Sequence, residues 1–156
     1  AAEALPFAAG AFDMLVCRMS AHHWQDLDAG LREAHRVLRT GAPAVFIDVV
    51  SPAHPMLDTH LQAVELLRDP SHVRDYRIAE WLAALARAGF NLRRAGTHEL
   101  PLEFMAWVER MQTPQPHVTA IRSLQLGASQ PIREAFAIRD DGSFTLQIAT
   151  FELEAQ

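Results

Sequence analysis

The stretch FDMLVCRMSAHHWQD, residues 12–26, decides the fold that we expect for this chain. Its first part, residues 12–17, is almost entirely apolar and predicts a short buried strand. Directly behind that strand stand Arg18, Ser20, two adjacent histidines and a tryptophan. A second apolar run, residues 44–50, predicts another buried strand after an intervening helix. Buried strands that alternate with amphipathic helices are typical of a parallel sheet covered on both faces, so we expect an α/β fold.

Helical spacing of apolar residues fills the segments between and after these strands. It predicts helices over residues 27–38, 57–67 and 78–88. Asp26 is the expected N-cap of the first helix, and Gly41 and Gly89 are the expected stop signals of the first and third. Trp81, Leu82 and Leu85 share one face of the third helix and are expected in the core.

The last part of the chain changes character. Residues 90–100 predict a third strand, and residues 101–139 predict a helical insert interrupted by Pro114 and Pro116. Residues 144–151 alternate between apolar and polar side chains, as in a strand with one wet face, and we expect this strand to be antiparallel. The length of 156 residues predicts a single domain spanning residues 1–156.

Composition excludes several classes of partner. The net charge is −5, so we expect no nucleic-acid partner. No segment approaches ~20 uninterrupted apolar residues, so we expect no membrane span. The single cysteine, Cys17, lies inside an apolar run, which indicates a reducing compartment and a cytoplasmic protein.

Two polar clusters follow the two predicted parallel strands. In open α/β sheets, ligands bind beyond the carboxyl ends of the strands. Residues 18–24 and residues 48–54 are therefore expected to face one crevice. Asp48 stands in a run of Val and Ile, where a carboxylate is costly unless it is hydrogen-bonded or paired. It either caps a neighbouring helix or faces a substrate.

Several short motifs occur in an order that resembles a known family. They are AEALPF at 2–7, FD at 12–13, EAHRVL at 33–38, AVFIDVV at 44–50 and WLAALARAGF at 81–90. Together they resemble class I S-adenosylmethionine-dependent methyltransferases, in the branch that includes ubiquinone- and menaquinone-pathway C-methyltransferases. The resemblance covers nearly all of residues 1–100. It implies a Rossmann-like, doubly wound sheet, of which this chain holds about the last four strands, with the final strand antiparallel.

Two departures from the family pattern stand out. Residues 39–43 read RTGAP where the family usually has Lys-Pro-Gly-Gly, although Gly41 still supplies a helix stop. The family's glycine-rich loop and its ribose-binding acidic residue have no counterpart in the chain. The resemblance therefore implies the C-terminal part of a methyltransferase, with weak donor binding and with the strand at residues 12–17 exposed as an edge. Such an edge is expected to pair with a second copy in a homo-oligomer.

The resemblance also implies a cofactor and a set of site residues. The cofactor is S-adenosylmethionine, and the substrate is a small molecule. The expected donor-binding residues are Ala1, Ala2 and Glu3 near the adenine, and Arg18, Ser20 and Trp24 near the transferred methyl group. His22 and His23 are the catalytic candidates, although methyl transfer depends mainly on alignment and a general base is optional. The alternative is that one histidine packs against Trp24 and the other is solvated.

Rival interpretations remain open from the residues alone. A zinc site from His22, His23, His54 and Asp48 lacks the fixed spacing of metal motifs, so we expect no metal. The polar run at 68–75 is either a solvated loop or a network lining the acceptor pocket, and the insert at 101–139 is a possible substrate lid. Other functions that fit are a non-catalytic binding or oligomerisation module and, less well, a histidine-based, metal-assisted hydrolase.

Overall fold

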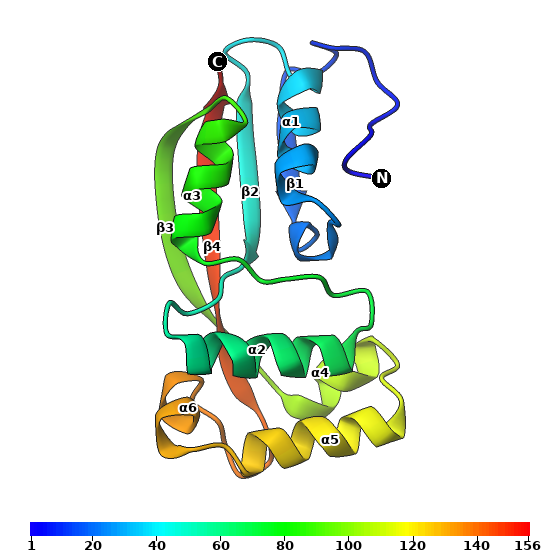
Figure 1. Ribbon diagram of the computed structural model, residues 1–156, viewed down its shortest axis with the longest axis vertical. Helices are drawn as coiled ribbons and strands as arrows, with labels where there is room; N and C mark the ends of the chain where they lie inside the picture. The colour runs from blue at the N-terminus through cyan, green and yellow to red at the C-terminus, as the bar shows by residue number, and fades with distance from the viewer.

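The computed structural model describes all 156 residues and contains one four-stranded mixed sheet (Figure 1). The strands are β1 (Leu15–Arg18), β2 (Pro43–Val49), β3 (Phe90–Leu102) and β4 (Phe144–Ala155), in the spatial order β1-β2-β4-β3. Strands β1 and β2 pair in parallel, and β4 is antiparallel to both of its neighbours. The predicted α/β class and the antiparallel final strand are confirmed.

The chain also contains seven helices. They are the 3₁₀ helix η1 (Ala21–His23) and the α-helices α1 (Leu27–Val37), α2 (Pro55–Arg68), α3 (Ile78–Arg87), α4 (Phe104–Arg110), α5 (Gln115–Leu126) and α6 (Gln130–Ala135). Asp26 caps α1 by accepting a hydrogen bond from the amide of Ala29 at 2.9 Å, as predicted. None of the helices combines the length and apolarity that a membrane crossing requires.

Pro114 and Pro116, which we expected to interrupt the helical insert, lie at the start of a helix. Pro114 is the N-cap of α5 and Pro116 lies in its first turn, where a missing amide hydrogen costs nothing. The predicted helical insert is therefore present as α4, α5 and α6. Gly89 has a φ of +92°, a conformation that glycine adopts easily, and it turns the chain from α3 into β3.

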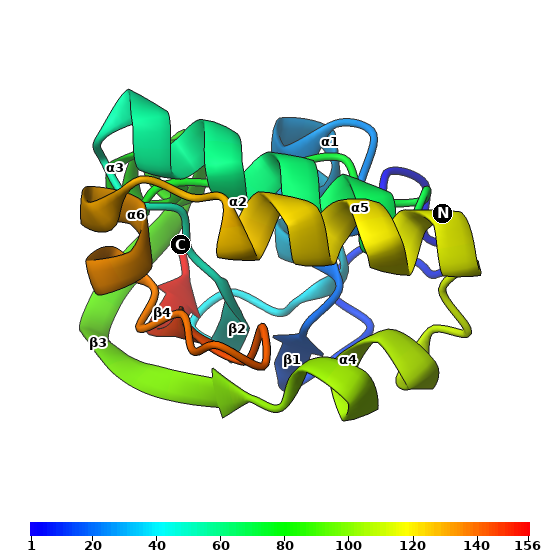
Figure 2. The same ribbon diagram turned by 90° about the horizontal axis from the view of Figure 1, so that it is seen from below.

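The first strand differs from the sequence expectation. It is only four residues long and lies at the edge of the sheet. Leu15 and Cys17 face α1 and are half-buried, whereas Val16 is 58% exposed and Arg18 is exposed on the other face. The prediction of a fully buried strand is wrong because helices α1 and α3 cover one face of this part of the sheet, and α4 alone reaches the lower end of the other (Figure 2).

The apolar interior consists of two clusters. One, here called the sheet core, lies between the sheet and helices α1 and α3, and its largest members include Trp81, Phe46 and Phe151. The other, the insert core, is formed by α2, α4, α5, α6 and the first half of β4. Trp81 and Leu85 are buried and Leu82 packs against the sheet core, which confirms their predicted place.

Candidate functional site

A sharp turn after β1 aims backbone amides at Asp48. Met19 has a φ of 51°, the left-handed region that non-glycine residues seldom adopt, and its N–H donates to the carbonyl of Ile47 at 2.8 Å. The chain then bends into η1, and the amides of Ser20 and Ala21 donate to Asp48 Oδ2 at 3.3 and 2.8 Å. The buried carboxylate of β2 therefore caps the helix that begins after β1.

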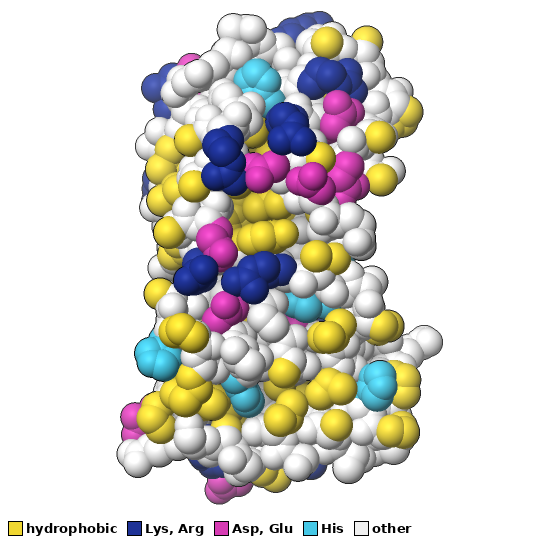
Figure 3. Space-filling view, in the orientation of Figure 1, with side chains coloured by type: hydrophobic (Ala, Val, Ile, Leu, Met, Phe, Trp, Pro, Cys, Tyr) yellow, Lys and Arg dark blue, Asp and Glu magenta, His cyan; other side chains and the backbone are white.

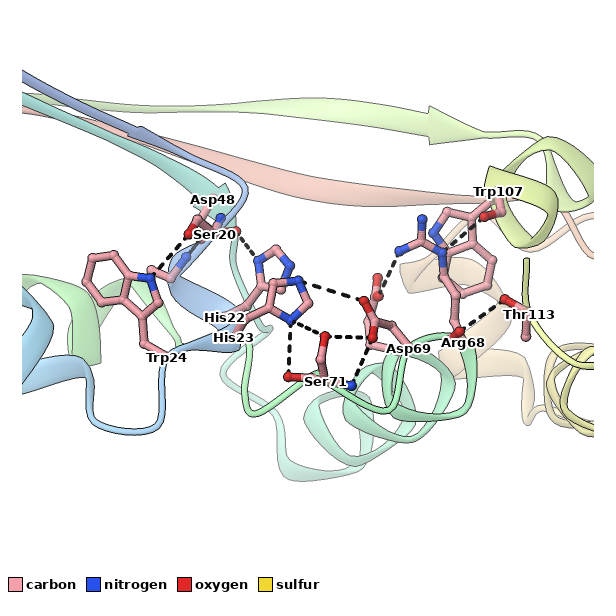
Figure 4. Close-up of polar contacts among 12 residues, drawn as sticks. Ser20, His22, His23, Trp24, Asp48, Arg68, Asp69, Ser71, Trp107 and Thr113 are labelled. Atoms are coloured by element: carbon pink, nitrogen blue, oxygen red, sulfur yellow. Dashed lines mark hydrogen bonds and ion pairs between the residues drawn. The ribbon is translucent and has the colours of Figure 1, made fainter. Parts of the chain in front are cut away.

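The same carboxylate holds His22. Asp48 Oδ1 lies 2.5 Å from Nδ1 of His22, and the Asp48 side chain is only 2% exposed (Figure 4). Burial by itself would lower the pKa of His22, but the hydrogen bond and the charge of Asp48 outweigh it and raise the pKa above its ordinary value. Because Nδ1 faces Asp48, Nε2 is left without a partner in the chain. Of the two roles expected for Asp48, helix capping is the one that the structure shows, and the same carboxylate orients a candidate catalytic side chain.

His23 is held by a different segment, residues 69–77, here called the strap. The Ser71 hydroxyl donates to Asp69 Oδ1 at 2.7 Å. Nδ1 of His23 lies 3.1 Å from the Ser71 carbonyl and donates to it, because a carbonyl oxygen can only accept. Nε2 of His23 lies 3.9 Å from Asp69 Oδ2. The two histidine rings are 4.1 Å apart between centroids. Neither histidine ring is in aromatic contact with Trp24, so the alternative that one of them packs on it does not hold.

Ser20 and Trp24 are occupied with each other. The indole N–H of Trp24 donates to the Ser20 hydroxyl at 3.2 Å (Figure 4). The indole ring lies directly on Gly30, where an added Cβ would be 2.3 Å from Trp24 Cε3. Trp24 also meets Phe46 of the sheet core edge to face. These contacts hold the indole between η1, α1 and the sheet core.

The remaining donor-binding candidates lie on two sides of η1. Glu3 Oε1 accepts from the amides of Gln25 and Asp26 at 2.8 and 3.3 Å, so it ties the N-terminal segment to the start of α1. Ala1 is exposed and Ala2 half-buried beside it. Arg18 is exposed and takes part in none of the ion pairs of the structure.

The polar run of residues 68–75 alternates between buried and exposed positions, so the alternative of a fully solvated loop does not hold. Asp69, His72 and Asp75 are buried, and so is Glu65 of α2. Burial raises the pKa of Glu65 and Asp75 and lowers that of His72 to about 4. In the sequence, this segment is recognisable by its many polar residues between two helices. That pattern does not indicate that several of these side chains are buried.

Metal binding finds no support in the arrangement of side chains. His54 is exposed and caps α2 by accepting from the amide of Met56 at 3.2 Å. No group of three His, Cys, Asp or Glu side chains in the structure could hold a metal ion. The four residues considered for zinc are therefore not assembled into a site.

A cavity of about 1200 Å³ opens near the end of the strap. Half of the residues that line it are hydrophobic, and ion pairs such as Arg87–Asp28 and Arg77–Glu80 stand at its rim. Figure 3 shows this recess as a hydrophobic hollow between two bands of charged side chains. Tyr76 lines it, but neither histidine does.

Known proteins match both the sequence and the fold. A family model for a methyltransferase domain matches residues 1–46. The chain is 50% identical over 147 residues to the uncharacterized protein YafE of Escherichia coli K12, spanning 94% of this chain and 71% of YafE. It is 34% identical over 137 residues to the uncharacterized methyltransferase YcgJ of Bacillus subtilis 168, spanning 88% of this chain and 54% of YcgJ.

Solved structures agree with these matches. The crystal structure of YcgJ has a TM-score of 0.93 to this chain at 31% identity, and the match covers 99% of this chain and 68% of that one. A protein from Bacillus halodurans C-125 also has a TM-score of 0.93, at 27% identity, with 98% and 74% covered. The chain belongs to the class I S-adenosylmethionine-dependent methyltransferases, whose reaction is methyl transfer. Its sequence is most alike, among these relatives, to YafE.

Proposed function

We propose that this chain forms the acceptor side of a cytoplasmic methyltransferase that acts on a small molecule, with His22 taking a proton from the acceptor. The observation that carries the proposal is the pairing of His22 Nδ1 with the buried carboxylate of Asp48 at the carboxyl ends of β1 and β2. In α/β sheets, ligands bind at the carboxyl ends of the parallel strands. Nε2 of His22 has no partner in the chain and is free to accept a proton.

The roles of the two side chains follow from their contacts. Asp48 fixes the imidazole with its proton on Nδ1, so that Nε2 is the basic atom, and its charge stabilises the imidazolium that forms. S-adenosylmethionine, when bound, supplies a methyl group on a positively charged sulfur. The protein then needs to align the acceptor and remove its proton, because alignment contributes most of the rate in such displacements.

The residues around η1 fit part of the donor. Arg18 is an exposed guanidinium without an ion-pair partner, which suits the carboxylate at the amino-acid end of S-adenosylmethionine. Ser20 and Trp24 contribute the wall beside the methyl group, and Ala1, Ala2 and Glu3 lie on the side proposed for the adenine. The 156 residues contain no glycine-rich loop after a strand, so we expect the chain by itself to bind the donor only in the millimolar range.

Donor binding is tested by calorimetric titration with S-adenosylmethionine. We expect weak binding that falls further in Arg18→Gln and is unchanged in Arg139→Gln, an exposed arginine of the insert. No heat of binding at millimolar donor would overturn the donor site, and a micromolar complex would show that a glycine-rich loop is not needed.

The role of His22 is tested through its titration. Because Asp48 raises the pKa of His22, Asp48→Asn is expected to lower it, as measured by NMR of the ring protons. The raised pKa makes His22 stabilise the fold fully below its unfolded pKa of about 6.5, a contribution that is lost as the pH rises through the folded pKa. Asp48→Asn should remove this dependence. An unchanged His22 titration would contradict the pairing.

Methyl transfer itself is measured with labelled donor and a panel of small phenols, amines and carbon acids. His22→Gln is expected to abolish methyl transfer to acceptors that must lose a proton. His23→Gln should retain it, because His23 contacts the strap and not the acceptor. Equal losses in both variants would indicate a structural role for the pair.

The edge of β1 is proposed as a contact with a second copy of the chain. One side of β1 has no strand neighbour, and Val16 of β1 and the preceding Met14 are 58% and 54% exposed. An apolar, unpaired edge favours pairing through a two-fold axis. At the opposite edge, β3 carries Arg93 and Arg94 in ion pairs with β4 and a register shift beside them, which disfavour such pairing. Light scattering after size exclusion should show a dimer that Val16→Glu dissociates, and a monomeric parent chain would overturn the proposal.

A further inference from the structure

The amide of Gln62, on α2, clamps the strap at Asp75. Its Nε2 donates to the Asp75 carbonyl at 2.8 Å, and its Oε1 accepts from the Asp75 N–H at 3.0 Å. A backbone N–H can only donate and a carbonyl can only accept, so these two bonds fix which end of the Gln62 amide is oxygen.

That orientation determines the tautomer of His72. Its Nε2 lies 2.9 Å from Gln62 Oε1, an acceptor, so Nε2 carries the proton. Nδ1 of the neutral ring is then a bare acceptor. It is buried and has no hydrogen-bond partner, and the whole residue is 7% exposed. A buried acceptor without a donor is uncommon in folded proteins and calls for a physical explanation.

Asp75 presents the complementary problem. It is 1% exposed, its Oδ2 is buried without a partner, and no arginine or histidine forms an ion pair with it. Its neighbour Arg74 pairs with Asp58 and Glu80 instead. An ionised carboxylate in such a place would have neither donor nor counter-ion, so the carboxyl group is far more stable there with its proton on.

We propose that Asp75 is a neutral carboxylic acid whose O–H serves Nδ1 of His72 through one bridging water, since the carboxyl group and the ring do not form an ion pair. The O–H supplies the donor that Nδ1 lacks, and the His72 ring and the Asp75 backbone N–H bind the same oxygen of Gln62, which brings the two residues to one amide. The His72–Asp75 pair is a positioning unit for His22, a consequence that rests on the proposed function of His22.

The pair lies close to the candidate base. The His72 ring is 5.9 Å from the His22 ring, and the amides of Val73 and Arg74 in the strap donate to the His22 carbonyl at 2.8 and 3.1 Å. A neutral pair adds no charge beside His22, whereas an ionised Asp75 would raise the pKa of His22 further. The strap therefore holds η1 in place without fixing the charge of its histidine.

The surrounding charges agree with a protonated Asp75. The titratable groups that act on it come from three elements, namely Glu65 and Asp58 of α2, Asp48 of β2 and His22 of η1. Three of these four are acids. Burial first, and then the charge of Glu65, raise the pKa of Asp75 well above its ordinary value. Burial also lowers the pKa of His72 to about 4, so the ring stays neutral at physiological pH.

The experiment compares Asp75→Asn with the parent chain by thermal and denaturant unfolding between pH 5 and pH 9. Folding of the parent takes up a proton at Asp75 above the unfolded pKa of about 3.9, so its folding constant falls by up to about tenfold per pH unit until the folded pKa is reached. Asparagine has no proton to take up, and its amide can still donate to the bridging water. The variant should therefore gain on the parent as the pH rises.

Asp69→Asn is the matched control in the same strap. Asp69 is also buried, but hydrogen bonds from the amide and hydroxyl of Ser71 outweigh burial and lower its pKa. It stabilises the fold above its unfolded pKa, and this contribution is lost as the pH falls through the folded pKa. Asp69→Asn should therefore lose stability at neutral pH, in the direction opposite to Asp75→Asn.

NMR of the histidine side chains gives a second readout that needs no activity. In the parent, His72 should remain in the Nε2–H form without titrating above pH 5, and His22 should titrate alike in the parent and in Asp75→Asn. A fall in the His22 pKa in the variant would show that Asp75 carries a charge, and would overturn the proposal, as would a stability difference independent of pH. These results are independent of methyl transfer, so the pair can stand if His22 proves not to be a base.

Discussion

The sheet core and the insert core are held together in different ways. In the sheet core, Trp81 stacks on Phe151 at 5.3 Å between centroids and meets Phe46 at 5.9 Å, and the surrounding contacts are almost all apolar. In the insert core, Trp107 meets Phe144 edge to face at 4.9 Å, but Arg68 also lies over the indole at 4.8 Å. The first is an ordinary apolar interior, whereas the second depends on a half-buried cation as well.

Arg68 joins three segments of the insert core. Its Nε donates to the Trp107 carbonyl at 3.0 Å, and its own carbonyl accepts from the Thr113 hydroxyl at 3.0 Å (Figure 4). The next residue, Asp69, holds Ser71 and faces His23. The insert is therefore connected to the candidate site through two adjacent residues, Arg68 and Asp69. A displacement of the insert should consequently move the segment that holds His23.

The largest difference between the two cores should appear on truncating their tryptophans. Trp81→Ala and Trp107→Ala each remove a buried indole and should cost about 3–5 kcal/mol. In hydrogen exchange, Trp81→Ala is expected to lower protection throughout the chain. Trp107→Ala should lower it mainly in α4, α5 and α6, because Trp107 belongs to the insert core. Equal loss in both regions for Trp107→Ala would mean that the two cores unfold as one.

Overpacking at the border of the sheet core should have the next largest effect. Gly30→Ala places a Cβ against the Trp24 ring, which must move away from Gly30 and from Ser20, at a cost of about 1–3 kcal/mol. Near-ultraviolet circular dichroism and chemical denaturation measure both changes. Gly96→Ala is the control, since nothing lies within 4 Å of its Cβ position and the residue is exposed. A Gly30→Ala variant as stable as Gly96→Ala would show that Trp24 is mobile.

A smaller effect is expected for the hydroxyl that binds Arg68. Thr113→Val removes the bond to the Arg68 carbonyl and should cost about 0.5–1.5 kcal/mol in denaturant unfolding. Thr119→Val is matched, because its hydroxyl bonds only to the Gln115 carbonyl of its own helix. If the strap is connected to the insert as described, Thr113→Val alone should also shift the ring resonances of His23.

The smallest effect should come from the exposed ion pair between α1 and α3. Arg87 contacts Asp28 with two nitrogens, but both side chains are more than a third exposed. Arg87→Gln should cost only about 0.2–1 kcal/mol, and less in high salt. A larger, salt-independent loss would indicate that the sheet core also depends on charge.

Much of the fold could be predicted because its signals are local. Asp26 followed by apolar residues at helical spacing specifies α1, and the alternation that begins at Phe144 specifies β4. The positions of His22 and Asp48 near the carboxyl ends of two strands also placed them at the same end of the sheet. The exposure of Val16 could not be predicted, because an apolar run reads the same at a sheet edge as at its centre.

By itself, the sequence determined the fold class, the order of helices and strands and the membership of a methyltransferase family, since propensity, periodicity and motif order are written along the chain. The tertiary structure alone decided what the polar residues do. The His22–Asp48 contact joins positions 26 residues apart, and the His72–Gln62 contact joins α2 to the strap. Whether a carboxyl group such as that of Asp75 carries a charge depends on the donors and the water around it, and these are set only when distant segments pack together.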